Sequence, residues 1–210
     1  MRWTMSTPVL SSSWWILGLA ILATSCSSNL DQAHYLAYLA DPTHGLTLTQ
    51  EVDGATVTCT YRPTDLVVSQ ELAGDEGDSR YPKVDSVRQA YASKLYCSLS
   101  LARDGGEIEN AFIRDEAALG QAISYLNNGI AQDVFVRGLG QPDSVAALAA
   151  TYPRQYGNTG RSTVLLVFPA AQLNVSQGFT CSFRDSHFGL APARFVFTAS
   201  SMRALPQLQF

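Results

Sequence analysis

The residue types best suited to binding chemistry are concentrated at residues 152–162, which read Tyr-Pro-Arg-Gln-Tyr-Gly-Asn-Thr-Gly-Arg-Ser. Tyrosine and arginine dominate binding hot spots because they present rigid contact area and several hydrogen-bond donors at a low entropic cost. The candidate binding residues are Tyr152, Arg154, Tyr156 and Arg161. The alternative is an ordinary loop that leads into a strand, since surface loops often contain such residues.

A second candidate for chemistry is the pair Asp185 and His187, which would share one face of an extended chain. They are weak candidates for a metal site or for acid–base catalysis, because a zinc site needs three or four ligands and no third one lies nearby in sequence. The chain contains no Gly-x-Ser-x-Gly, His-Glu-x-x-His or phosphate-loop motif. The sequence therefore indicates a non-catalytic protein and predicts no cofactor.

Three of the four cysteines, Cys59, Cys97 and Cys181, each occupy the apolar phase of an alternating segment. That phase predicts that all three side chains point into the core. No two cysteines are spaced as Cys-x-x-Cys, so neither a zinc knuckle nor a thioredoxin-type redox motif is present. An odd number of thiols cannot all pair within one chain, and whether two of them form a disulfide stays open.

The elements that position these residues follow from the hydrophobic period. Alternation with a period of two predicts one mainly β domain over residues 45–210, an antiparallel β-sandwich with two or three inserted helices. The alternative is a two-layer α+β arrangement. A hairpin is expected around Asp53-Gly54, a dipeptide that favours a type I′ turn. Further strands are expected at 95–101, 133–137, 163–168, 179–183 and 194–199.

Helical spacing predicts helices at 30–40, 82–94 and 116–127, the last ended by Asn128-Gly129 as a left-handed stop. A short helix is expected at 144–151. Residues 64–72 suit either a helix or a strand.

The N-terminal region contains an uncharged run from Trp14 to Cys26 behind the single cation Arg2. A transmembrane helix needs about 20 apolar residues, so this shorter run favours a cleaved export signal. The predicted organisation is a signal peptide at 1–25, a tether with a short helix at 26–44, and the β-rich domain.

The end of that run, Leu22-Ala23-Thr24-Ser25-Cys26, resembles the lipobox of bacterial lipoproteins. It departs from the commonest form at Ala23, where leucine is usual, and at Ser25, where glycine is usual. The resemblance implies cleavage before Cys26, acylation of that residue and attachment to a membrane through the lipid anchor. An ordinary secretory signal and an uncleaved anchor are the alternatives. Ser27 stands where aspartate would resemble the inner-membrane retention signal, which implies the outer membrane, with either orientation open.

The segments Asp41-Pro42-Thr43-His44-Gly45-Leu46 and Tyr61-Arg62-Pro63 complete a pattern that is similar to a class of Gram-negative envelope lipoproteins. The class brings no catalytic residues. A net charge of −4 and the lack of a basic run argue against a nucleic-acid partner. We therefore predict a lipid-anchored, non-catalytic binding or assembly module for another envelope or secreted protein. A glycan-binding or glycan-processing surface lipoprotein and a small metal-dependent hydrolase are the alternatives.

Overall fold

The computed structural model describes residues 1, 29–73, 80–171 and 173–210, with the side chains of the helix that begins at residue 80 described from Val84 onward. The predicted signal peptide, 1–25, and the predicted acylation site, Cys26, lie outside the described residues. Within the described part, no helix combines the length and the apolar character that a membrane span requires.

Three β-sheets organise the described residues, and the mainly β fold is confirmed. The larger sheet has the order β2-β3-β4-β9-β8 with β5 beside β4, and its strands are β2 (Thr47–Val52), β3 (Ala55–Arg62), β4 (Lys94–Arg103), β5 (Gly106–Glu107), β8 (Ala149–Thr151) and β9 (Ser162–Pro169). The smaller sheet has the order β11-β10-β6-β7, formed by β6 (Val134–Gly138), β7 (Val145–Ala146), β10 (Gly178–Phe183) and β11 (Ala193–Thr198). Both sheets are antiparallel, and a short parallel pair joins β1 (Asn29–Leu30) to β12 (Gln207–Leu208).

The predicted hairpin is confirmed at β2 and β3. Asp53 and Gly54 both have a positive φ, at 47° and 75°, as a type I′ turn requires. Threonine hydroxyls hydrogen-bond across the two strands, between Thr49 and Thr58 at 2.9 Å. The turn and the outward threonines therefore set the register of this edge of the larger sheet.

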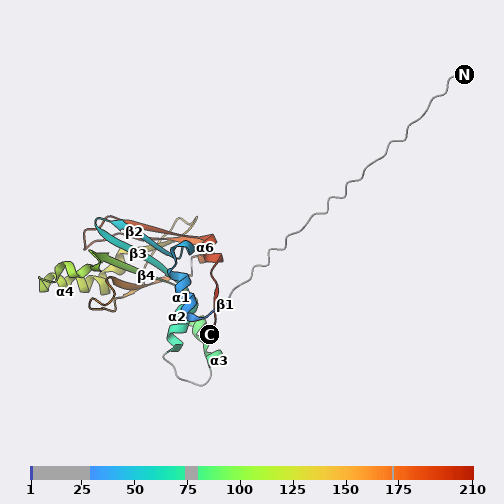
Figure 1. Ribbon diagram of the computed structural model, residues 1–210, viewed down its shortest axis with the longest axis horizontal. Coiled ribbons are helices and arrows are strands. Elements are labelled where there is room, and N and C mark those ends of the chain that lie inside the picture. The colour runs from blue at the N-terminus through green and yellow to red at the C-terminus, as the bar shows by residue number, and fades with distance from the viewer. Residues whose placement is uncertain (2–28, 74–79, 172) are drawn as a thin grey trace.

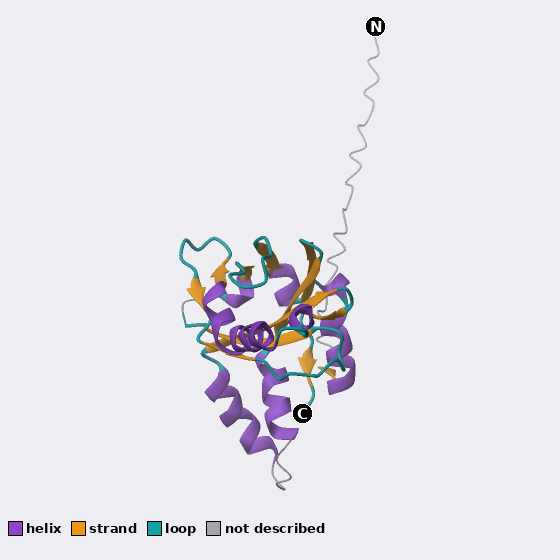
Figure 2. Cartoon of the chain, turned by 90° about the vertical axis from the view of Figure 1, so that its left-hand side faces the viewer, coloured by secondary structure: helices purple, strands orange, loops and turns teal. Residues whose placement is uncertain are grey.

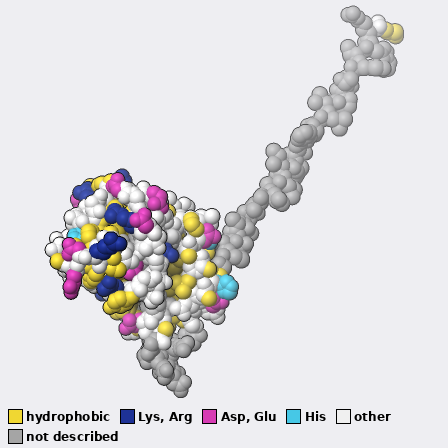
Figure 3. Space-filling view, turned by 60° about the vertical axis from the view of Figure 1, so that its left-hand side comes forward, with side chains coloured by type: hydrophobic (Ala, Val, Ile, Leu, Met, Phe, Trp, Pro, Cys, Tyr) yellow, Lys and Arg dark blue, Asp and Glu magenta, His cyan; other side chains and the backbone are white. Residues whose placement is uncertain are grey.

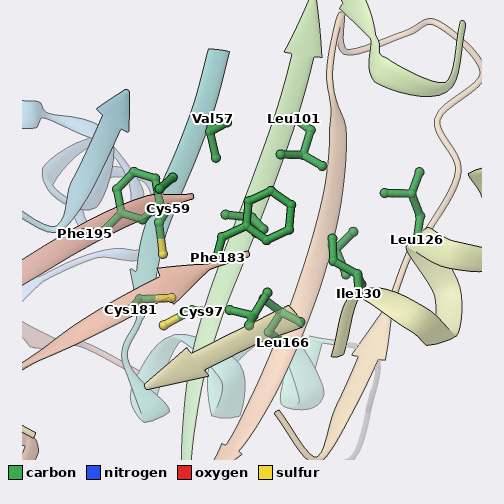
Figure 4. Packing of buried hydrophobic residues seen from close by; sticks show 14 of the residues in the cluster. Val57, Cys59, Cys97, Leu101, Leu126, Ile130, Leu166, Cys181, Phe183 and Phe195 are labelled. Atoms are coloured by element: carbon green, nitrogen blue, oxygen red, sulfur yellow. The ribbon is translucent and has the colours of Figure 1, made fainter. Parts of the chain in front are cut away.

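The inner faces of the two sheets share one hydrophobic core. Alternate residues of β3, β4 and β9 meet alternate residues of β6, β10 and β11, and Figure 4 shows that Cys59, Cys97 and Cys181 point toward one another there. All three cysteines are fully buried free thiols, which confirms their predicted direction. The pKa of the Cys97 thiol is raised well above its ordinary value, mainly because burial disfavours the charged thiolate.

Six α-helices accompany the sheets in the described residues, and five of them lie within 45–210, where two or three were expected. They are α1 (Gln32–Ala40), α2 (Thr64–Ala73), α3 (Arg80–Tyr91), α4 (Glu116–Ser124), α5 (Ile130–Asp133) and α6 (Ala199–Arg203), with shorter turns η1 (Pro42–His44), η2 (Ile108–Phe112), η3 (Tyr125–Gly129) and η4 (Val175–Gln177). Helices α1, α2 and α3 lie at one end of the molecule, whereas α4 lies at the opposite end (Figure 1). The α2–α3 pair projects from the β-core (Figure 2).

Helix α1 confirms the short helix predicted at 30–40, and it packs on the domain. Its N-terminus is capped by the Asp31 carboxylate, which accepts from the His34 amide at 2.9 Å. Tyr35 and Leu39 are buried in a second apolar cluster that also contains Leu208. This cluster fixes the start and the end of the domain to each other.

Two local predictions are wrong. The helix predicted to stop at Asn128-Gly129 continues through η3 and α5, because Gly129 has a right-handed φ of −69°. Glycine is needed there for space: a Cβ would lie 2.7 Å from the Tyr125 ring. The helix predicted at 144–151 is instead the two short strands β7 and β8, which pair with β6 and β9.

Candidate functional site

The loop of residues 152–162 connects β8 to β9, and the structure places its four candidate residues differently. Tyr152 is buried, with 5% of its surface exposed, whereas Tyr156 is 76% exposed. Arg154 is half-buried and Arg161 is exposed. Three of the four side chains are therefore open to a partner, and Tyr152 has an internal role.

Two buried carboxylates, Glu107 and Glu109, hold this loop in place. The Tyr152 and Ser162 hydroxyls both donate to Glu109, and Glu107 accepts from the amide of Gly157 at 2.8 Å. Burial, followed by the bond to Glu109, raises the pKa of the Tyr152 hydroxyl, so Tyr152 remains a donor at neutral pH. Glu109 and Ser162 are 0% exposed, which closes the cluster to any substrate. We call Glu107 and Glu109 the clamp, because Glu109 holds both ends of the loop and Glu107 holds its middle.

The clamp presents Tyr156 in an unusual conformation. Its backbone has a φ of 52°, in the left-handed region that few non-glycine residues adopt. The guanidinium carbon of Arg154 lies 4.8 Å from the centroid of the Tyr156 ring. Arg154 makes no hydrogen bond with any described residue, and its Nε is buried without a partner. The Tyr156 ring orients the Arg154 guanidinium, but the N–H groups of Arg154 have no hydrogen-bond acceptor among the described residues.

Arg161, at the other end of the loop, lines a shallow hollow of about 260 Å³ on the outer face of the larger sheet. The other lining residues are Thr56, Thr58, Ser100, Ala102, Gly105, Thr159 and Gly160. Among the described residues, this lining is mainly small and hydroxyl-bearing, and Arg161 is the one cationic side chain in it.

The surface around the loop mixes cations and apolar area. The loop is bonded to η2, and η2 packs against α4 at the end of the molecule that Figure 3 brings forward. Lys and Arg side chains lie beside hydrophobic side chains on this face, with Asp and Glu around them (Figure 3). The exposed Ile113, at 65%, follows directly after η2. Protein interfaces are on average no more apolar than the rest of a protein surface, so the candidate site depends on its exposed tyrosine and arginines and not on this apolar area.

Asp185 and His187 lie close together but are used by the loop that contains them. The Asp185 carboxylate accepts from the amides of His187, Phe188 and Leu190, at 2.8–3.1 Å. The His187 ring stacks on Tyr125 with centroids 5.0 Å apart, and its Nε2 is buried without a hydrogen-bond partner among the described residues. Within the described ranges, no group of three or more His, Cys, Asp or Glu residues is arranged to hold a metal ion.

Sequence reasoning missed two groups of residues. Glu107 and Glu109 flank Ile108 in a turn-rich, largely polar segment, so no local pattern marked them as buried. A second group lines a hollow of about 420 Å³ on the outer face of the smaller sheet, with Arg137, Arg184 and Arg194 among its residues. Arg137 lies on β6, whereas Arg184 directly follows β10 and Arg194 lies on β11, so the fold is needed to bring Arg137 beside the other two.

Comparisons with protein-family models, with curated proteins and with solved structures find no match.

Proposed function

We propose that this protein is a lipid-anchored, non-catalytic binding module of the bacterial envelope, and that the 152–162 loop docks another envelope or secreted protein. One observation carries the proposal: Arg154 stacks on the exposed Tyr156 and makes no hydrogen bond with any described residue. A buried donor that lacks a partner costs about 1–3 kcal/mol. A partner that supplies an acceptor would recover that free energy.

The chemistry of the loop favours a protein partner with a carboxylate on its surface. Guanidinium groups bind carboxylates through two parallel hydrogen bonds, and Arg161 adds a second exposed cation at the other end of the loop. Tyr156 supplies rigid aromatic area beside Arg154. Aromatic and arginine side chains of this kind account for most of the free energy in protein interfaces.

The scaffold supports a binding role. We interpret the two antiparallel sheets, which share one core, as an open β-sandwich with inserted helices. Sandwich domains commonly bind partners through loops at one end, because the sheets hold the loops rigidly. The clamp formed by Glu107 and Glu109 reduces the ordering entropy that docking through this loop would cost.

Support for the anchor comes from the lipobox-like residues 22–26, and Ser27, which stands where the retention signal has aspartate, supports an outer-membrane location. Two or three acyl chains at Cys26 would hold the protein firmly, because stable attachment takes more than a single chain. A Cys26→Ser variant is expected to move from the membrane fraction to the soluble fraction. Retention of this variant on membranes, or mass spectrometry showing an unacylated mature start, would contradict the anchor.

Docking is tested by chemical cross-linking in intact cells followed by quantitative mass spectrometry of the captured protein. We expect the double variant Arg154→Ala/Tyr156→Ala to recover its partner at least tenfold less than the parent, since hot-spot residues contribute about 2 kcal/mol or more. Arg203→Ala, which removes an exposed arginine on α6, is the matched control and should recover the partner normally. Equal recovery by the double variant and the parent would refute the docking role of the loop.

A further inference from the structure

We propose a second binding site on this protein, separate from the docking loop, that binds an acidic polysaccharide across the outer face of the smaller sheet. The site is the hollow of about 420 Å³ lined by Arg137, Arg184 and Arg194 together with Phe135. We call this hollow the arginine groove. Its remaining lining residues are Pro142, Ser144, Ser182, Phe183, Pro192 and Ala193.

The arginine groove concentrates positive charge on a chain whose net charge is −4. No acidic residue lines it, and none of its three guanidinium groups forms an ion pair or a hydrogen bond with a described residue. The guanidinium carbon of Arg184 lies 5.8 Å from the centroid of the Phe135 ring. Like charges gathered without counter-charges repel one another, so a bound anion would stabilise the groove.

The register of the sheet places the three arginines at successive positions along the direction of β10. Arg137 on β6 is paired with Thr180 of β10, and Arg194 on β11 is paired with Ser182. Arg184 follows two residues further along the same chain segment. A strand rises about 3.3 Å per residue, so the cations succeed one another at intervals of roughly 7 Å along β10. This spacing favours an extended ligand with several anionic groups over a single small anion.

The other lining groups favour a sugar chain as that ligand. Ser144 and Ser182 offer hydroxyls that can both donate to and accept from sugar hydroxyls, and Phe135 offers an aromatic ring beside them. An acidic peptide would gain most by adding a strand at a sheet edge, whereas the groove lies on a sheet face. Nucleic acid is disfavoured by the overall negative charge and by the absence of lysine from the lining. A polymer with one carboxylate on each sugar fits best, because each carboxylate can accept a bidentate bond from an arginine.

The test measures binding of a galacturonate hexamer to the full-length protein in detergent by isothermal titration calorimetry. We expect binding that weakens as salt rises and that falls at least tenfold in Arg137→Gln/Arg194→Gln. The control Arg114→Gln/Arg203→Gln removes the same charge from two exposed arginines outside the groove and should bind as the parent does. Arg194→Lys keeps the charge but loses the planar fork, so it should bind more weakly than the parent.

Three further ligands separate the possible outcomes: a neutral glucose hexamer, polyglutamate and single-stranded DNA. Tighter binding of polyglutamate or DNA than of the uronate would overturn the ligand class, and an absence of any uronate binding would overturn the site. The loop variant Arg154→Ala/Tyr156→Ala should retain uronate binding. Loss of uronate binding in that variant would show that the two sites are not separate.

Discussion

The hydroxyl of Tyr152 donates a hydrogen bond to the carboxylate of Glu109, a residue 43 positions earlier in the chain, and both side chains are buried. Glu109 also accepts from Ser162, so one carboxylate joins the two ends of the 152–162 loop to η2. A tyrosine that the sequence suggests for a binding surface therefore holds that surface in place. The exposed contacts come from its neighbours Arg154 and Tyr156.

Tyr152→Phe should destabilise the protein by about 1–3 kcal/mol, because it leaves part of a buried carboxylate without a donor. Urea unfolding followed by circular dichroism measures the loss. Glu109→Gln should cost a similar amount, and the double variant should cost less than the sum, since both changes remove the same interaction. Additive losses would show that the two side chains are not coupled.

Gly178→Ala should cost roughly 2 kcal/mol or more. Gly178 has a φ of 89° and a ψ of 164°, a conformation that is essentially restricted to glycine. A Cβ there would lie 2.5 Å from the carbonyl oxygen of Phe197, a backbone atom that cannot move away cheaply. Gly140→Ala, with a φ of 79° and no described atom within 4 Å of its Cβ, is the control for a positive φ alone. If both variants lost the same free energy of unfolding, the clash of the new Cβ with the Phe197 carbonyl would contribute nothing to the loss at Gly178.

Tyr96→Phe should leave stability at neutral pH unchanged or raise it by about 1 kcal/mol, since the Tyr96 hydroxyl is buried without a hydrogen-bond partner in the described residues. Tyr38→Phe is the contrasting control, because the Tyr38 hydroxyl donates to the Ala204 carbonyl at 2.9 Å. Thermal unfolding of both variants should show a loss for Tyr38→Phe alone. A clear loss for Tyr96→Phe would reveal a bond to this hydroxyl.

Tyr96 also makes stability dependent on pH above neutrality. Burial raises the pKa of Tyr96 from its ordinary 10.0 to about 12. The unfolded chain therefore loses this proton first, so the free energy of unfolding is unaffected by Tyr96 titration below pH 10 and falls as the pH rises from 10 to 12. Urea midpoints measured between pH 9 and 12 should fall less steeply in Tyr96→Phe than in the parent. If the urea midpoints of Tyr96→Phe and the parent fell in parallel with pH, the loss of stability at alkaline pH would be due to other residues.

The strands could be predicted from sequence because their side chains alternate so strictly. Val57 and Cys59 face the core at every second position with threonines between them, and the Asp53-Gly54 turn fixes its own hairpin. The segment 144–151 was mispredicted because it consists of two very short edge strands, which depend on pairing with β6 and β9 and carry almost no periodic signal. The helix stop predicted at Gly129 is wrong for a different reason. This glycine provides space for the Tyr125 ring, and the sequence alone does not show that contact.

The candidate site was predictable only in its exposed part. The composition of residues 152–162 pointed to Arg154 and Tyr156, which the structure presents outward. The buried role of Tyr152 depends on Glu109, and the arginine groove depends on the alignment of β6, β10 and β11. Both are contacts between distant segments, which a single sequence does not encode in any local pattern.

The three core thiols provide a further prediction about the interior. Cys59, Cys97 and Cys181 are 0% exposed and come from both sheets, so a thiol reagent should label none of them in the folded protein and all three in urea. Labelling of one thiol alone after unfolding would instead show a disulfide between the other two. Mass spectrometry of the labelled protein counts them directly.

Substitution of Cys181 tests the polarity of the same region. Buried thiols behave as small apolar groups, so Cys181→Ala removes one atom from the core and should cost about 1 kcal/mol. Cys181→Ser keeps nearly the same volume but buries a hydroxyl that faces the thiols of Cys59 and Cys97 (Figure 4), which are weak hydrogen-bond partners, so it should cost about 1–3 kcal/mol. Serine should therefore be the more damaging change in urea unfolding. If serine were tolerated better than alanine, the interior between the two sheets would have to supply a hydrogen-bond acceptor or a water molecule at this position.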